Sequence, residues 1–349
     1  MKKTIFAFFL IFLLSLTACS ARSSAPDAQQ TSEPQAETSS QVDISELPDG
    51  QCYRQTPYLN PIGISYPEGQ CVWNGKVYSF SNAPGKLGVT DANGNSEALE
   101  LPDAEYIYGV CENGDTLAVL AGADPLFFAG TDNEQSAQAS ENGNHAIYLY
   151  DEAGNLTGSI PLAERYADAP YALDGDGTDY FLLFSDAVVR VGSDGTQLAK
   201  SGDMGGRLLQ LACADGAVYV CVEGDRIYQT EKLVRLNAQT LEFEAELSCA
   251  GLDIQGMGTA ADGTLLLISG EYLLRPDFEA GTMRAILHWA DNANTSVNNY
   301  RSILETEPGF FAWNSDVEAA CFYEKLPDGE TLEEPTVITL FAGTGSYEI

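Results

Sequence analysis

The chain has 349 residues and a formal net charge of −34, because 51 Asp and Glu face only 17 Lys and Arg. Phosphate binding needs clustered Lys and Arg, so this composition argues against nucleic acid as a partner and disfavours unaided binding to anionic lipid. An acidic surface usually serves solubility. The alternative is an acidic face for cationic ligands or Ca²⁺.

Residues 1–18 have the pattern of a signal peptide. Lys2 and Lys3 precede an apolar run from Ile5 to Leu14, which is short for a membrane-spanning helix. The next residues, Leu16-Thr17-Ala18-Cys19, resemble the lipobox of bacterial lipoproteins. The resemblance implies a lipid on Cys19, which becomes the first mature residue, and an extracytoplasmic protein anchored to the membrane of a bacterial cell envelope. The alternative is an ordinary signal peptide with a chance cysteine.

Residues 19–49 are predicted to be a disordered tether that begins at Cys19. Residues 20–47 are mostly small or polar and include no aromatic side chain, so they cannot bury enough apolar surface to offset the entropy of ordering. About 30 such residues have an r.m.s. reach of roughly 30 Å. A lipid at one end and a folded body at the other require a spacer of this kind.

A short hairpin recurs through the rest of the chain. Each copy is a polar Asn/Asp/Gly turn followed by an apolar strand, and the clearest copies lie at 73–80, 112–120, 174–184, 214–222, 261–269 and, more weakly, 313–322. The turn glycines at 75, 114, 177, 216 and 263 are 39, 63, 39 and 47 residues apart, and the long interval contains a polar insertion at 123–145. A period of roughly 40–45 residues with four strands per repeat is typical of a β-propeller.

A second set of hairpins alternates strictly with the first. Its members lie at 87–102, 146–162, 187–201, 233–248 and 285–296, and a less clear candidate follows at 325–340. One hairpin from each set gives a four-stranded antiparallel blade. We therefore expect an all-β propeller of six blades over residues 50–335, or seven if residues 52–66 supply closing strands. Trp313-Asn314 is expected to match Trp73-Asn74, and residues 336–349 to form a C-terminal strand.

The topology predicts one face with short turns and one with longer loops. The loops expected at 122–146, 223–232 and 270–284 all fall on the second face. Long loops on a rigid scaffold often carry binding residues. The candidate ligand-binding residues on these loops are Phe127, Phe128, Tyr228, Tyr272 and Arg275. The alternative is that the loops are decorative, which we favour for the wholly polar stretch 131–144.

Seven cysteines remain after Cys19, and an odd number cannot all pair within one chain. Cys71, Cys111, Cys213 and Cys221 lie in or beside apolar strands. We expect buried thiols there rather than a disulfide framework. One bridge, for instance from Cys52 to a neighbouring blade, stays open as an alternative.

The search for catalytic motifs finds none. GxSxG, HExxH and the P-loop are absent, and the two histidines, His145 and His288, belong to no visible cluster. The densest oxygen cluster is Asp174, Asp176 and Asp179, but it lacks the spacing of an EF-hand loop. We interpret it as a turn, with a weak Ca²⁺ site as the alternative, and expect no other metal or cofactor.

The lipobox, the polar tether and hairpins such as YLYDEAGNL together resemble the front part of certain extracellular solute-binding lipoproteins of ABC importers. In that group a propeller-like segment precedes the solute-binding domain. The stretch Glu334–Gly343 looks like the first strand of such a domain, but the chain ends at Ile349, so no ligand residues carry over and truncation is an open interpretation.

The resulting hypothesis is a non-enzymatic, lipid-anchored propeller that binds or scaffolds an unknown protein, glycan or small solute. One alternative is an extracellular hydrolase or lyase that acts on polysaccharide or peptide. Another is a truncated fragment of a solute-binding lipoprotein.

Overall fold

The computed structural model describes strands and connections within residues 42–347. The described residues are 42–43, 53–58, 69–81, 85–90, 96–99, 101, 106–122, 145–162, 166, 170–225, 229–252, 254–260, 262–270, 272–288, 300–306, 309–314, 319–325, 340–342 and 345–347. The chain divides into two compact units, Met1–Glu37 and Thr38–Ile349, and all described residues belong to the second. Within the described ranges, no helix has the length and apolar character needed to cross a membrane.

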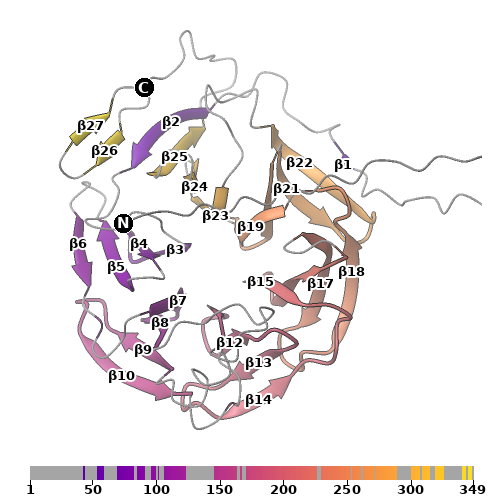
Figure 1. Ribbon diagram of the computed structural model, residues 1–349, viewed down its shortest axis with the longest axis horizontal. Coiled ribbons are helices and arrows are strands. Elements are labelled where there is room, and N and C mark those ends of the chain that lie inside the picture. Colours follow the sequence, from indigo (N-terminus) through magenta and orange to yellow (C-terminus); the bar gives the residue numbers. More distant parts are fainter. Residues whose placement is uncertain are drawn as a thin grey trace, which may run out of the picture. The chain divides into compact units, whose positions relative to one another are not determined.

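Four sheets have four antiparallel strands each, and each sheet is one blade (Figure 1). The prediction of an all-β propeller with four-stranded blades is confirmed. The strands of these sheets are β3 (Gly69–Trp73), β4 (Lys76–Ser81), β5 (Lys86–Thr90) and β6 (Ser96–Leu99); β7 (Tyr106–Asn113), β8 (Thr116–Gly122), β9 (Ala146–Tyr150) and β10 (Leu156–Pro161); β11 (Ala172–Gly175), β12 (Tyr180–Leu183), β13 (Val188–Val191) and β14 (Gln197–Lys200); β15 (Leu208–Ala214), β16 (Ala217–Glu223), β17 (Thr230–Asn237) and β18 (Phe243–Ser248).

The fifth sheet is larger and has nine strands in the order β1-β22-β21-β20-β19-β23-β24-β25-β2. Its strands are β1 (Val42–Asp43), β2 (Tyr53–Tyr58), β19 (Ile254–Thr259), β20 (Leu265–Ser269), β21 (Tyr272–Asp277), β22 (Thr282–His288), β23 (Tyr300–Thr306), β24 (Gly309–Asn314) and β25 (Ala319–Lys325).

The expectation of six or seven separate blades is therefore wrong, because the structure has five. The reason lies in the parallel pairing of β19 with β23, in which Met257, Gly258 and Thr259 are partners of Ser302, Ile303 and Leu304. This pairing makes the strands expected for a sixth blade continuous with the fifth. The strand expected from residues 52–66 is present as β2, which pairs antiparallel with β25.

The sheets are arranged as a ring through their innermost strands (Figure 1). β3 contacts β7, β7 contacts β11, β11 contacts β15, β15 contacts β19, and β23 contacts both β19 and β3. Apolar clusters fill the spaces between neighbouring blades. In β8, for example, Val119 packs toward the β3–β6 blade and Leu120 toward the β11–β14 blade. Burial on both faces explains why the second strand of each blade is a continuous apolar run rather than an alternating one.

One local expectation is also wrong. Trp73 closes the turn between β3 and β4, whereas Trp313-Asn314 ends β24, the second strand of its group, so the two pairs are not equivalent. Of the hairpin expected at 285–296, residues 285–288 belong to β22, which pairs with β21 across a turn at 278–281, and residues 289–296 lie outside the described residues. Residues 325–340 lie mostly outside the described residues. The C-terminal strand expected after 336 is a two-stranded sheet of β26 (Leu340–Ala342) and β27 (Gly345–Tyr347).

Candidate functional site

Antiparallel connection gives the propeller two different rims. We call turn rim the face with the connections from first to second and from third to fourth strands, such as 74–75, 114–115, 215–216 and 238–242. We call loop rim the opposite face, which carries the second-to-third connections and the connections between blades. Those connections include 123–145, 201–207 and 224–229.

The turn rim is built from tight turns that hydrogen-bond to one another. Asn74 and Gly75 have φ of 49° and 70°, and Asp215 and Gly216 have φ of 47° and 68°. Two successive positive φ values define the type I′ turn, which matches the twist of the flanking strands. The Trp73 Nε1–H donates to the Gly114 carbonyl of the next blade at 3.4 Å, and the Asp215 N–H donates to the Gly263 carbonyl at 2.8 Å. These bonds tie neighbouring blades together.

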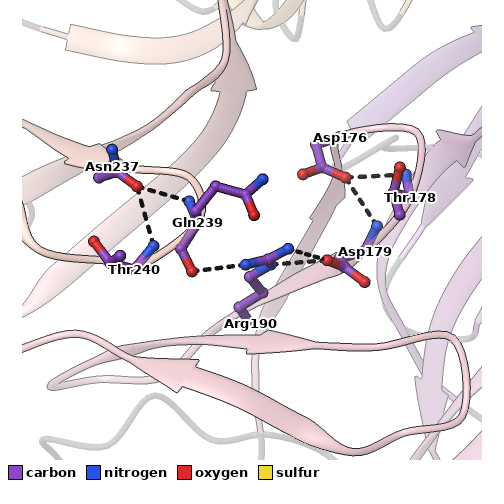
Figure 2. A network of polar contacts seen from close by, with 7 residues as sticks. All are labelled: Asp176, Thr178, Asp179, Arg190, Asn237, Gln239 and Thr240. Carbon is purple, nitrogen blue, oxygen red and sulfur yellow. Dashed lines mark hydrogen bonds and ion pairs between the residues drawn. The ribbon is translucent and has the colours of Figure 1, made fainter.

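The three aspartates of the suggested Ca²⁺ site are not brought together as ligands. Asp174 accepts the Gly175 N–H at 2.8 Å and the Cys213 N–H at 2.7 Å. Asp176 instead caps its own turn by accepting the N–H groups of Thr178 and Asp179 at 2.9 and 2.8 Å (Figure 2). In the part of the chain that the structure describes, no three His, Cys, Asp or Glu side chains form a group that could hold a metal ion.

Asp179 forms a buried ion pair with Arg190 (Figure 2). The Arg190 side chain is 13% exposed and the Asp179 side chain 9%. Arg190 Nε donates to Asp179 Oδ2 at 2.8 Å, and Nη1 donates to the Gln239 carbonyl of the next blade at 2.6 Å. Gln239 lies in a turn that is held by a hydrogen bond from its own N–H to Asn237 Oδ1 at 2.9 Å. The network therefore joins the β11–β14 and β15–β18 blades.

Asp174 is the most perturbed carboxyl of the inner strands. Burial raises the pKa of Asp174 to about 6, although the hydrogen bonds from Cys213 and Gly175 oppose the shift. The nearby carboxylate of Glu112 adds to the rise, and burial also raises the pKa of Glu112 itself. A carboxyl group that titrates near neutrality is one mark of a functional site, although structural networks produce the same effect.

Three thiols lie near Asp174, one on each of three other inner strands. They are Cys71 on β3, Cys111 on β7 and Cys213 on β15, and burial followed by neighbouring carboxylates raises the pKa of each. With Cys221 and Cys249 they are free cysteines. The prediction of buried thiols is confirmed for Cys111 and Cys221, whereas Cys71 and Cys213 are partly buried. A thiol with a raised pKa is protonated at neutral pH and is a poor nucleophile or metal ligand.

On the loop rim, the described residues place an arginine beside a tyrosine. The Tyr171 hydroxyl donates to the Leu208 carbonyl and is also hydrogen-bonded to the Arg207 side chain. The Glu223 N–H donates to the Arg207 carbonyl at 2.7 Å. Burial raises the pKa of Tyr171 although Arg207 opposes it. The bond from the Tyr171 hydroxyl to the Leu208 carbonyl joins the β11–β14 and β15–β18 blades here and places a guanidinium and a phenol side by side.

The structure describes two of the five residues predicted on the long loops, Tyr272 and Arg275. Phe127, Phe128, Tyr228 and Cys19 lie outside the described residues. Tyr272 and Arg275 are not in a loop, because 272–277 is strand β21. The Tyr272 side chain packs against the apolar cluster between two blades, and Arg275 pairs with Asp262 of a turn-rim connection at 3.2 Å. The apolar run Tyr272-Leu273-Leu274 is the local signal for a strand here. Of the two histidines, His145 is buried beside Tyr108, with ring centroids 5.5 Å apart.

Sequence reasoning missed the groups that join the blades. The contacts Arg190–Gln239, Asp174–Cys213 and Tyr171–Leu208 each connect residues of different blades, and no local pattern reports such pairs. The positions of Cys71, Cys111 and Cys213 shortly before a turn in three repeats were the one visible signal.

Comparison with known proteins supports the fold. No protein-family model matches the chain, and no curated protein matches it. A structural genomics protein of unknown function from Bacteroides thetaiotaomicron superposes with a TM-score of 0.56 at 12% identity, over 79% of this chain and 76% of that one. The structure of YCF48 bound to a D1 peptide superposes with a TM-score of 0.50 at 11% identity, over 82% of this chain and 99% of that chain. A virginiamycin B lyase from Staphylococcus aureus superposes with a TM-score of 0.48 at 15% identity, over 80% of this chain and 90% of that chain. At these identities the likeness shows the fold alone: the chain is a β-propeller.

Proposed function

We propose that this β-propeller is a non-catalytic binding or scaffold module whose loop rim takes the ligand. The observation that carries the proposal is the difference between the two rims. Tight turns on the turn rim bond to one another across blades, as Asp215 does to Gly263. The connections of the loop rim vary in length, from the four residues 184–187 to the 23 residues 123–145. Variable loops on a fixed scaffold are the usual place for recognition.

The loop rim also has the chemistry for a polar ligand. The half-buried Arg207 side chain, together with Tyr171, can bond to a carboxylate or a hydroxyl group. Cations are rare in this acidic chain, so an arginine directly before the inner strand β15 is a distinctive feature. We propose a polar solute, glycan or peptide as the ligand.

We further propose that Cys19 carries a lipid and that the module works outside the cell, accessory to solute uptake by an ABC importer. This part is supported by the lipobox and the polar tether. It therefore rests on sequence resemblance and is independent of the loop-rim argument.

The ligand proposal is tested by isothermal titration calorimetry of the full-length chain. The probes are a set of malto-, cello- and xylo-oligosaccharides and a tryptic digest of casein. We expect one probe class to bind, Arg207→Ala to weaken that binding at least tenfold, and the turn-rim variant Lys76→Ala to leave it within twofold. Equal effects of the two variants would contradict a site on the loop rim. If neither probe class produced binding heat, the proposal of a solute ligand would be contradicted.

A second candidate is an extracellular hydrolase or lyase. The observation that favours it is the pKa of Asp174, raised to about 6, because a general acid or base is most effective when its pKa lies near the working pH. This candidate requires that Asp174→Asn abolish turnover of a polysaccharide or peptide while binding persists. Equal turnover in the variant would exclude Asp174 as the catalytic group.

A further inference from the structure

Both edges of the nine-stranded sheet are formed by strands from the N-terminal part of the chain. The sheet begins with β1 and ends with β2. β1 pairs parallel with β22, with Val42 opposite Met283 and Asp43 opposite Arg284. β2 pairs antiparallel with β25 along its whole length, from Tyr53–Lys325 to Tyr58–Ala320. The same N-terminal segment therefore covers the outer edge of β22 and the outer edge of β25 (Figure 1).

The contact of β1 with β22 involves side-chain packing. Val42 is partly buried and packs against the apolar cluster that contains Met283, Leu274 and Cys249, all fully or almost fully buried. Burying a valine side chain is worth roughly 1.5–3 kcal/mol when complete, so a partly buried one still favours the docked position.

The charges beside β1 suit an acidic residue at position 43. Arg284 lies opposite Arg275 on the neighbouring strand, and like charges in directly opposed positions repel. Asp277 accepts from Arg284 at 3.5 Å and Asp262 accepts from Arg275 at 3.2 Å. Asp43 occupies the register position on the other side of Arg284, so it adds a third carboxylate to a row that holds two guanidinium groups.

These observations change the length of the spacer expected from the sequence. Residues 19–49 were predicted to be one free tether, but residues 42–43 are a strand on the perimeter of the propeller. Only residues 20–41 then separate Cys19 from the first docked residue, with an r.m.s. reach of about 25 Å. Val42 lies opposite Met283, the second residue of β22, and the turn 278–281 that precedes β22 belongs to the turn rim, so β1 begins at the turn-rim end of the outer edge of β22.

We propose that β1 is a docking strand that fixes the exit point of the membrane tether, so that the turn-rim end of β22 faces the membrane and the loop rim remains accessible. The inference rests on the proposed lipid anchor at Cys19. Docking supplies an orientation that surface charge does not, since an acidic body is not attracted to anionic lipid. It also covers an edge strand that would otherwise expose unpaired backbone groups.

Methionine methyl groups provide the test, because the described methionines lie in different places. Met283 is on β22, Met204 is in a loop-rim connection and Met257 is on the inner strand β19. The full-length lipidated chain, labelled at the methionine methyls, is placed in nanodiscs of phosphatidylcholine that carry a headgroup nitroxide. We expect the Met283 resonance to be broadened at least twice as strongly as those of Met204 and Met257. Strongest broadening of Met204, or equal broadening of all three, would overturn the proposal.

Two variants separate docking from anchoring. Val42→Asp removes the apolar contact of β1, and Ser40→Asp adds the same charge two residues earlier in the sequence. We expect Val42→Asp to remove the preference for Met283 and to speed amide exchange in β22 at least fivefold, while Ser40→Asp changes neither. Equal effects of the two variants, or no effect of Val42→Asp, would overturn the docking role. Failure of the anchor is recognised separately, because the unvaried chain would then not copurify with nanodiscs at all.

Discussion

Replacing Asp174 with asparagine should make the chain less sensitive to pH. The Asp174 carboxyl has a pKa of about 6 in the folded chain, against an ordinary value of 3.8, chiefly because it is buried. The folded chain therefore holds this proton up to higher pH than the unfolded chain does. The unfolded state has bound fewer protons throughout that window, so folding stability falls as pH rises from about 4 to 6.

The size of the effect follows from the same values. At pH 5 the unfolded carboxyl is already almost fully ionised and the folded one is mostly protonated. Between pH 5 and pH 7.5 the folded form must also lose its proton, which costs about 1.4 kcal/mol, the equivalent of one pKa unit. Asparagine keeps one oxygen acceptor for the Cys213 N–H and has no charge to bury. We expect the stability of Asp174→Asn relative to the native chain to rise by about 1.4 kcal/mol between these two pH values.

Urea unfolding followed by far-ultraviolet circular dichroism, at pH 5.0 and pH 7.5, measures this difference. The comparison is between two chains at each pH, so the titration of other acidic groups cancels to first order. A relative stability of Asp174→Asn that falls as pH rises would refute the reasoning, because it would mean that the two N–H donors stabilise the carboxylate more than burial destabilises it.

Three further predictions test other contacts. Arg190→Leu leaves Asp179 buried without its partner and should lower the free energy of unfolding by about 3–5 kcal/mol. The double variant Arg190→Leu, Asp179→Leu should recover most of the lost stability. Equal losses in the single and double variants would contradict the pairing. A Cβ at Gly206 would lie 2.5 Å from the Glu223 carbonyl oxygen, whereas one at Gly202 would meet nothing within 4 Å. Gly206→Ala should therefore cost about 1–3 kcal/mol in urea unfolding, and a similar loss in Gly202→Ala would contradict the packing argument. Burial and a raised pKa should slow alkylation of Cys111 by iodoacetamide at least roughly a hundredfold in the native chain relative to the urea-unfolded chain, as followed by mass spectrometry; similar rates would contradict its protected position.

The fold class was predictable because its signals are local. Each Asn/Asp-Gly turn and each run of apolar residues reports a hairpin by itself, and the hairpins recur at a regular interval. The strand YLLRPD at 272–277 was not predicted, and its short apolar run is followed directly by Arg275, Pro276 and Asp277. Its partner across the turn, at 282–288, could have revealed it.

The number of blades was not predictable in the same way. Whether β23 starts a separate sheet depends on its hydrogen bonds to β19, which join residues about 45 positions apart in sequence. The docking of Val42 on Met283 joins residues far more distant, and a polar tether gives no local hint of it. The candidate site has the same difficulty, since Tyr171 and Arg207 meet only when two blades pack.

The central claim is that the propeller is anchored by lipid outside the cell. Metabolic labelling with an alkyne fatty acid in a bacterial host tests this claim most directly. The native chain and Cys19→Ala are compared in the membrane and soluble fractions. The account predicts a labelled native chain in the membrane fraction and an unlabelled Cys19→Ala chain that is lost from it. An unlabelled native chain in the soluble fraction would contradict the account.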